Sequence, residues 1–286
     1  ESDGRSKFEL YPAMQLGGAP PELFDQAKDG VVDIIWTVLG YTPGRFPKSE
    51  VFELPFMIPN GEIGSAAFYN YVQENSADEF AGVHVIALHT HGPGLFHSKE
   101  PVTSLEDLNG MKVRGGSRII SDMLAELGAE PIGMPVPQVT EALSKGVIDA
   151  TTIPWEVTPS LRVAELVQNH TGFTSQNGLY TQTFGFVMNM DSYNNLPDDL
   201  KAVIDANSGL ETSRMFGRVM DNGDATGLSI AVNAGNNVVQ LDEAETARWI
   251  EAAEPVVDRW LADMDGQGID GQALLDAARA AVAAEM

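Results

Sequence analysis

Short apolar runs alternate with amphipathic stretches along the first two thirds of the chain. The runs are rich in β-branched and aromatic residues, which predicts strands, and the stretches between them repeat apolar positions at helical spacing. We expect strands at Lys7–Tyr11, Val32–Trp36, Val83–Leu88, Met111–Arg114, Ala150–Ile153 and Thr183–Asn189. We expect helices at Pro21–Asp29, Ile63–Glu74, Ser117–Leu127 and Pro137–Lys145. This alternation predicts an α/β protein with mostly parallel sheets.

After Asp191 the pattern changes to long helices. They are expected at Pro197–Gly227, Glu243–Met264 and Gly271–Glu285, with one more strand at Val232–Gln240. Neither an internal repeat nor a low-complexity linker divides the chain. The absence of a sharp boundary suits two lobes that exchange strands.

Composition narrows the function. Seventeen Lys and Arg against 41 Asp and Glu give a formal charge of -24 among 286 residues, so binding to nucleic acid or anionic lipid is not expected. Cysteine is absent, which excludes disulfides and thiol chemistry. No apolar run is long enough for a membrane helix, and we expect any secretion signal to have been removed. Because the protein as a whole is negatively charged, an anionic ligand would need a positively charged side chain at its binding site.

Signatures of catalysis and of metal binding are weak. No nucleophile elbow, P-loop or H-E-x-x-H motif occurs. His89 and His91 end an apolar strand, and side chains at i and i+2 face the same way, so a metal site there stays open beside a packing or ligand-facing role. Asp263-Met264-Asp265-Gly266 hints at a calcium loop but has Leu274 at the twelfth position, which favours a polar turn. We predict no metal and no cofactor.

The stretch around Arg114 is more informative. Met111 to Ser117 reads M-K-V-R-G-G-S, which places an arginine at the carboxyl end of a strand, followed by glycines and a helix start. Ligands of α/β sheets bind beyond such strand ends, and helix N-termini favour anions there. A guanidinium matches a carboxylate with two parallel hydrogen bonds. The alternative is an arginine paired with a surface Asp or Glu.

Landmarks between Gln15 and Pro154 resemble the solute receptors of TRAP (tripartite ATP-independent periplasmic) transporters. In chain order they are Gln15-Leu16-Gly17-Gly18, Asp29-Gly30-Val31-Val32-Asp33, Glu53-Leu54-Pro55-Phe56, the run L-E-D-L-N-G-M-K-V-R from Leu105 to Arg114, Leu127-Gly128-Ala129-Glu130-Pro131, and Ala142 to Asp149. Each is short, but their shared order is a specific signal. The helical C-terminal half is similar to the family only in outline.

The resemblance implies a two-lobed, periplasmic-binding-protein-like α/β fold with strand exchange between the lobes and a long C-terminal helical region. Lobe I would comprise residues 1–91 and 180–219, and lobe II residues 92–179 and 220–286. It also implies a periplasmic receptor, not an enzyme, that hands a small organic carboxylate to the membrane subunits of a TRAP transporter. We expect a monomer. Arg114, the arginine of the signature, would anchor the carboxylate between the lobes.

Three departures from the family bear on the ligand. Relatives open with a strand and helix, on the order of 30 residues, before the position of Glu1. Either the protein lacks this unit or the sequence is incomplete, and we favour the second interpretation. Ile153 stands where many relatives have a ligand-contacting Asn, and Trp155 follows closely. Gly94 stands where sialic-acid-type members have a second arginine.

These departures favour an aromatic or otherwise apolar monocarboxylate. A sugar acid would bury unpaired hydroxyls, at a cost of ~1–3 kcal/mol each, whereas an aromatic body gains from stacking. Trp36 and Phe184 are candidate walls, each with plain core as its alternative. Tyr180 and His89 are candidate polar contacts to a ring substituent.

Rival functions remain open. A C4-dicarboxylate or sugar acid is the alternative ligand, and a small-molecule hydrolase using His89 or His91 is the nearest enzyme. A sensor domain of a signalling system and a receptor for an ATP-driven importer would use the same fold.

Overall fold

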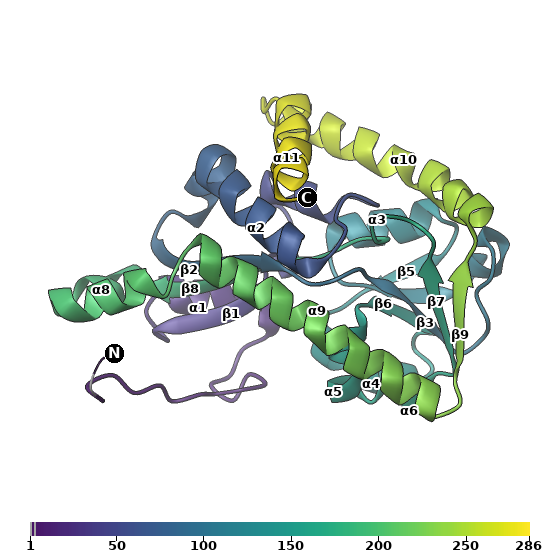
Figure 1. Ribbon diagram of the computed structural model, residues 1–286, viewed down its shortest axis with the longest axis horizontal. Coiled ribbons are helices and arrows are strands. Elements are labelled where there is room, and N and C mark those ends of the chain that lie inside the picture. The colour runs from purple at the N-terminus through teal and green to yellow at the C-terminus, as the bar shows by residue number, and fades with distance from the viewer. Residues whose placement is uncertain (1, 3) are drawn as a thin grey trace.

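Two β-sheets surrounded by helices make up the computed structural model, which describes residue 2 and residues 4–286 (Figure 1). Within these residues the smaller sheet is antiparallel and has the order β1 (Ile34–Val38), β8 (Thr183–Asn189) and β2 (Val83–Thr90). The larger sheet has the order β5 (Glu130–Gly133), β4 (Lys112–Gly115), β6 (Ala150–Ile153), β3 (Leu95–Ser98), β7 (Asn169–Phe173) and β9 (Asn237–Leu241). In it β4 runs parallel to β5 and β6, and β7 parallel to β9, while β3 is antiparallel to both its neighbours. The α/β prediction is confirmed.

Helices cover both sheets. The α-helices are α1 (Leu23–Lys28), α2 (Gly61–Tyr71), α3 (Arg118–Glu126), α4 (Val139–Lys145), α5 (Thr158–Leu161), α6 (Val163–Leu166), α7 (Met190–Asn194), α8 (Asp198–Ala206), α9 (Leu210–Asn233), α10 (Glu243–Gly266) and α11 (Gly271–Glu285). Single turns of 3₁₀ helix lie at Leu39–Tyr41, Val136–Gln138 and Trp155–Val157, and longer ones at Ser49–Glu53 and Leu105–Leu108. In Figure 1, α2, α10 and α11 lie above the sheets, and α9 crosses in front of both.

Most predicted elements form close to their expected bounds. The strands β6 and β8 and the helix α11 match their predictions, and β1, β2 and β4 are displaced or extended by one or two residues. In these segments the apolar positions repeat regularly and turn residues lie at both ends. Sequence patterns are most informative in such segments.

The predicted strand Lys7–Tyr11 was wrong. The segment has no strand hydrogen bonds, and Phe8 and Leu10 are 70% and 83% exposed. A strand forms only beside another strand, and none of the described residues lies alongside this segment as a sheet neighbour.

Two predictions in the C-terminal half need correction. The expected helix Pro197–Gly227 is two helices, α8 and α9, because the chain turns at Gly209, which has a φ of 95° that other residues avoid. The expected strand Val232–Gln240 begins too early, since α9 continues to Asn233 and β9 spans Asn237–Leu241.

Three short strands were not predicted. The strand β3 is buried along its whole length, so it has no polar alternation to reveal it. The strand β5 contains Pro131, which an edge strand tolerates because one side has no partner. The strand β7 mixes polar residues and Gly172 without a period.

The long helix α9 contacts elements of both sheets at close range. It packs on α2 beside the smaller sheet and on the turn Trp155–Val157 after β6 of the larger one. At each contact α9 has a glycine: a Cβ on Gly217 would lie 2.0 Å from the carbonyl oxygen of Gly61, and one on Gly227 would lie 2.0 Å from that of Trp155. The helix therefore approaches backbone against backbone at both places.

Two aspartates of α9 strengthen these contacts. Asp221 accepts hydrogen bonds from the N–H groups of Gly61 (2.7 Å) and Glu62 (2.8 Å) at the start of α2. Asp224, one turn later, accepts from Glu156 N–H at 2.8 Å. A carboxylate at a helix N-terminus satisfies orphan donors and suits the helix dipole.

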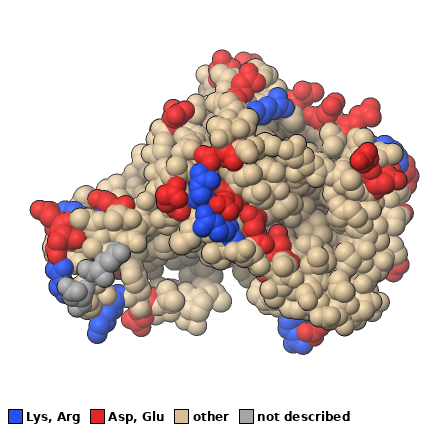
Figure 2. Space-filling view, viewed as in Figure 1, with Lys and Arg blue, Asp and Glu red and all other residues tan. Residues whose placement is uncertain are grey.

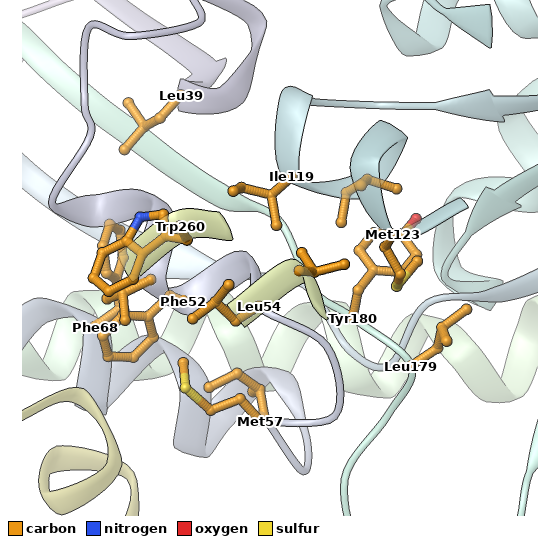
Figure 3. Packing of buried hydrophobic residues seen from close by; sticks show 14 of the residues in the cluster. Leu39, Phe52, Leu54, Met57, Phe68, Ile119, Met123, Leu179, Tyr180 and Trp260 are labelled. Atoms are coloured by element: carbon orange, nitrogen blue, oxygen red, sulfur yellow. The ribbon is translucent and has the colours of Figure 1, made fainter. Parts of the chain in front are cut away.

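The helix α10 also links the two sheets. Trp249 is buried against Phe96 and Phe173 of the larger sheet, with ring centroids 5.4 and 5.1 Å away. Trp260, three turns further on the same face, is buried near Phe52 and Phe68 and donates to the carbonyl of Pro47 at 3.2 Å (Figure 3). One continuous hydrophobic core therefore joins both sheets.

The lobe boundaries remain a prediction. All strands of the smaller sheet fall in the ranges expected for lobe I, and all strands of the larger sheet fall in those of lobe II. The helix α11, however, packs against α2. This packing favours placing Gly271–Glu285 with lobe I.

The contact between α9 and α2 generates a stability prediction. Gly217→Ala pushes a methyl group into the Gly61 carbonyl, and we expect it to lower the free energy of unfolding by about 1–3 kcal/mol in urea titrations. Gly266→Ala, in α10 with no neighbouring atom within 4 Å, is the matched control and should be neutral or slightly stabilising. Equal urea midpoints for the two variants would contradict the packing described.

Candidate functional site

Arg114 lies at the carboxyl end of β4 and is completely buried. Its Nε donates to the carbonyl of Met134 at 2.9 Å, and its Nη1 donates to the carbonyl of Thr152 at 3.2 Å. Met134 directly follows β5, and Thr152 lies in β6. The guanidinium therefore caps the ends of both strands that flank its own.

The remaining nitrogen of this guanidinium is unpaired. Nη2 is buried without a hydrogen-bond partner, and the ion pairs among the described residues all involve other cationic side chains. Arg114 is also the only Lys or Arg that is buried in the described part of the chain. A buried cation without a counter-charge costs several kcal/mol, so this arrangement suits an anion bound at Nη2. The alternative of a surface ion pair is excluded.

Two further donors lie beside Arg114. A Cβ placed on Gly116 would lie 2.7 Å from Gln182 Nε2 and 2.8 Å from Arg114 Nη2, so the missing side chain lets these groups meet. Gln182 Nε2 is buried and unpaired. The buried hydroxyl of Tyr180 has no hydrogen bond of normal geometry, although the Thr152 hydroxyl lies near enough to lower its pKa. Burial raises the pKa of Tyr180 to about 12, which keeps it a donor at neutral pH. A guanidinium, an amide and a phenol are suitable partners for a carboxylate.

His91 supports this cluster without adding charge. Its Nε2 accepts from the N–H of Gln182 at 3.0 Å, and its Nδ1 faces the carbonyl of Gly92. Burial lowers its pKa to about 4, despite the Gly92 contact, and the nearby Arg114 lowers it further. The neutral ring therefore fixes the backbone of Gln182.

Glu53 is a buried carboxyl that bonds to Thr183, the residue after Gln182. Its Oε1 accepts from both the N–H and the hydroxyl of Thr183 at 3.0 Å. Its Oε2 has no hydrogen bond, although the Ser117 hydroxyl lies near enough to lower the pKa of the carboxyl. Burial dominates and raises that pKa to about 7.

Neither Gln182 nor Glu53 was predicted as a site residue. In the sequence Glu53 is part of the E-L-P-F landmark. Gln182 lies in the polar run Thr181-Gln182-Thr183, directly before the apolar residues of β8. A polar run directly before a buried strand is the sequence feature that could have indicated Gln182 as a site residue.

The candidates Trp36, His89 and Phe184 form an aromatic stack on the smaller sheet. The ring of Phe184 lies 4.6 Å from His89 and 5.4 Å from Trp36, nearly parallel to both. Trp36 Nε1 donates to His89 Nε2 at 2.7 Å, and Trp36 is 47% exposed whereas the other two are buried. Both nitrogens of His89 have neighbours, Nδ1 facing the Thr90 carbonyl at 3.3 Å, so His89 offers a ring face rather than a free polar edge.

Phe184 connects this stack to the polar cluster. Its centroid lies 6.0 Å from His91, and His91 lies 5.5 Å from Tyr180, both edge to face. An aromatic surface therefore continues from the stack to the donors around Arg114.

Trp155 lies on the larger sheet beside two buried histidines. Its ring is 5.0 Å from His97 and 4.9 Å from His170. His97 Nε2 meets the Ile153 carbonyl at 3.2 Å, the two Nδ1 atoms lie 2.7 Å apart, and His170 Nε2 faces the amide of Asn236 at 3.0 Å. One tautomer assignment satisfies every atom: His97 donates to Ile153, His170 donates to His97, and Asn236 donates to His170. This neutral chain fixes the backbone at Ile153 and the position of Trp155.

Ile153 itself is part of the hydrophobic core. It is buried in a small apolar cluster with Val139, Leu143 and Val163 under the larger sheet. Its predicted contact with the ligand stays a prediction.

The described residues do not form a metal site. Within the described residues no group of three or more His, Asp or Glu is placed to hold a metal ion. The segment Asp263–Gly266, expected as a turn, is the last turn of α10, where Asp263 pairs with Arg118.

A cavity of about 540 Å³ near α9 lies in a region where charges of both signs gather (Figure 2). It is lined by Asn60, Glu62, Ile63, Pro93, Arg214, Asp221, Asp224 and Glu285. None of these side chains belongs to the Arg114 cluster.

The chain matches characterised proteins over nearly its whole length. Residues 1–263 match the family described as bacterial extracellular solute-binding protein, family 7 (DctP). A TRAP solute-binding protein from Rhodoferax ferrireducens T118, solved with copurified benzoate, is 49% identical with a TM-score of 0.97, over 99% of this chain and 89% of its own. A marine metagenome TRAP solute-binding protein specific for aromatic acid ligands, solved with metahydroxyphenylacetate, is 45% identical with a TM-score of 0.98, over 99% of this chain and 90% of its own.

A third structure is more distant. It is a TRAP periplasmic solute-binding protein from Bordetella bronchiseptica with bound (R)- and (S)-mandelate, 30% identical with a TM-score of 0.88, over 98% of this chain and 89% of its own.

The fold and these similarities define a two-lobed solute receptor. The chain belongs to the family 7 extracellular solute-binding proteins, the receptors of TRAP transporters, which act in the periplasm with membrane subunits. The predicted family, fold class and transport role are confirmed. None of the described helices is long and apolar enough to cross a membrane.

Gly94 provides a test of the cluster's geometry. In place of a second arginine, this position has Tyr180 packed against it: a Cβ on Gly94 would lie 2.1 Å from Tyr180 Cε1, and Gly94 N–H donates to the Tyr180 carbonyl at 2.9 Å. We expect Gly94→Ala to displace the ring and weaken solute binding at least ~10-fold, or about 1.4 kcal/mol, by calorimetry. Gly133→Ala, with nothing within 4 Å, is the control. Unchanged affinity in Gly94→Ala would show that the Tyr180 position is unimportant.

The histidine chain generates a pH prediction. Burial lowers the pKa of His170 to about 4, whereas in the unfolded chain it returns to about 6.5, so unfolding takes up a proton between these values. Stability is therefore lost as pH falls from 6.5 towards 4. In His170→Asn we expect the slope of unfolding free energy against pH to be shallower by up to about 1.4 kcal/mol per pH unit. Denaturant titrations at several pH values measure it, and identical slopes would contradict a neutral buried His170.

Proposed function

We propose that this receptor binds an aromatic monocarboxylate, with Arg114 as the anchor of the carboxylate and without chemical turnover. The observation that carries the proposal is the buried, unpaired Nη2 of Arg114, beside the unpaired donors of Gln182 and Tyr180. Together they present donors and one positive charge to a single small anion.

The charge inventory favours a monocarboxylate over a dicarboxylate. A second carboxylate would need a second buried cation, and Arg114 is the only one in the described part of the chain. Glu53 would repel it. Burying an uncompensated charge costs several kcal/mol, which opposes C4-dicarboxylates.

The surroundings favour an aromatic body. The ring of Tyr180 carries one of the donors, and Phe184 lies near it through His91. The stack of Phe184 with Trp36 and His89 extends the ring surface. The similar proteins solved with benzoate and metahydroxyphenylacetate support the same class. A uronate would place several hydroxyls against these rings, at a cost of ~1–3 kcal/mol for each one left unpaired.

Contacts between the proposed lobes are consistent with a closed arrangement. Val136 N–H, in proposed lobe II, donates to the hydroxyl of Tyr41, in proposed lobe I, at 2.9 Å. Gly40 packs against Ser117, where an added Cβ would lie 2.5 Å from the Ser117 Cβ. A ligand that binds more tightly to the closed arrangement would stabilise it. The membrane subunits would then recognise this closed arrangement.

A ligand panel tests the proposed class. In thermal-shift and calorimetric titrations, benzoate and substituted benzoates should raise the melting temperature, while succinate and galacturonate should not. Mass spectrometry of the bound benzoate should return it unchanged, which tests the absence of turnover. Stabilisation by galacturonate or succinate alone would overturn the assignment.

The anchor is tested by Arg114→Lys. An ammonium group cannot keep the bonds to Met134 and Thr152 and also present Nη2, so we expect benzoate affinity to fall by ~2–5 kcal/mol. Arg259→Lys, at a surface ion pair with Glu126, is the matched control and should bind as the wild type does. Full affinity in a folded Arg114→Lys protein would refute the anchor.

A further inference from the structure

The polar cluster contains one carboxyl group, and its ionised form accepts hydrogen bonds and so cannot bind a carboxylate. Arg114 Nη2, Gln182 Nε2 and the Tyr180 hydroxyl are donors, whereas Glu53 Oε2 is a carboxyl oxygen. Glu53 is wholly buried, and its other oxygen is already bonded twice by Thr183. A buried carboxyl oxygen needs a donor, as a buried guanidinium needs an anion.

Glu53 is positioned within the same group of residues. It lies against Gly40 and Ser117, with both carboxyl oxygens 3.2 Å from a Cβ placed on Gly40. Ser117 is the N-cap of α3, three residues after Arg114. Tyr180 lies within electrostatic range of both charges, since Arg114 lowers its pKa and Glu53 raises it. The phenol is therefore close enough to both Arg114 and Glu53 to feel the charge of each.

Protein donors leave Oε2 of Glu53 without a hydrogen bond of normal geometry. The Ser117 hydroxyl lies close enough to lower the pKa of the carboxyl, but its position relative to Oε2 does not meet hydrogen-bond geometry, and no described cationic side chain forms an ion pair with Glu53. If Glu53 were only structural, both oxygens would be expected to have protein partners, as at Glu79, whose carboxyl accepts from Lys48 N–H, Ser49 N–H and the Ser49 hydroxyl.

We propose that Glu53 Oε2 accepts a hydrogen bond from a hydroxyl group of the ligand, so that the receptor selects hydroxylated aromatic monocarboxylates over the unsubstituted acids. This inference rests on the proposed function and names the substituent that the same site recognises. The ligand then has two polar ends: an anion at Arg114 and a donor at Glu53. The aromatic ring between them lies beside Tyr180 and Phe184.

Calorimetry with matched ligands tests the proposal. The panel comprises benzoate, 3- and 4-hydroxybenzoate, mandelate, and 3- and 4-fluorobenzoate, which resemble the hydroxy acids in size but donate nothing. Titrations at pH 8 keep Glu53 ionised, because its pKa is about 7. Since hydrogen bonds to charged groups are among the stronger ones, at least one hydroxy acid should bind about 10-fold or more tightly than benzoate and than its fluoro analogue. The preferred isomer locates the hydroxyl.

Glu53→Gln is the matched substitution. Its amide oxygen can keep both Thr183 bonds, which orients the NH₂ group to the place of Oε2 and replaces the acceptor with a donor. The preference for the hydroxy acid should collapse to within about 3-fold, whatever the absolute affinities. Glu79→Gln removes a partly buried carboxyl elsewhere and should keep the wild-type preference.

The outcomes separate the two proposals. If benzoate and its derivatives all fail to bind, the proposed function is wrong and this inference falls with it. If benzoate binds but no hydroxy acid exceeds it, or the fluoro analogue matches the hydroxy acid, only the role of Glu53 is overturned. A preference that survives in folded Glu53→Gln also overturns it. Should that variant not fold, the fluoro comparison in the wild type decides alone.

Discussion

A buried guanidinium that lacks a counter-charge is the constraint on which the site depends. Arg114 is held at the junction of three strands because the ends of β5 and β6 supply carbonyls to Nε and Nη1. Those bonds fix the plane of the group but do not neutralise it. Of 41 acidic residues in the chain, none described pairs with it. The positive charge of Arg114 is therefore available to an anionic ligand, as a receptor for an anion requires.

The two long helices make this placement possible. Both α9 and α10 contact elements of both sheets, α9 through glycines and helix-capping aspartates, and α10 through two tryptophans on one face. Close backbone contact leaves little room for adjustment along α9. The chain also crosses between the sheets in two segments without regular structure, residues 91–94 and 174–182, which contain Gly94 and Tyr180. The Tyr180 ring beside the proposed anion site is thus also part of a connection between the sheets.

Sequence patterns predicted the architecture better than the details of the site. Periodicity located β6, β8 and α11 because each repeats clearly between turn residues, and it placed Arg114 at the end of a strand, as the structure has it. The pattern could not show β3, which is buried on both faces, or the break at Gly209. It also could not reveal that His89 is bonded to Trp36, or that Ile153 faces the core, since both depend on residues distant in the chain. Glu53 and Gln182 were missed for the same reason: their partners, Thr183 and His91, come from other segments.

The buried histidines explain why one positive charge suffices. His89, His91, His97 and His170 all have pKa values lowered by burial, to between about 3 and about 4, and so are neutral at physiological pH. Arg114 then acts on the ligand without help from imidazolium groups, and one carboxylate balances it. Outside the site the net charge of -24 repels the same anion, but salt screens this repulsion beyond about 8 Å at physiological ionic strength. The buried pair is screened much less. Ionic strength should therefore act on the approach of the ligand more than on the bound complex, because the interactions that define specificity lie inside the protein.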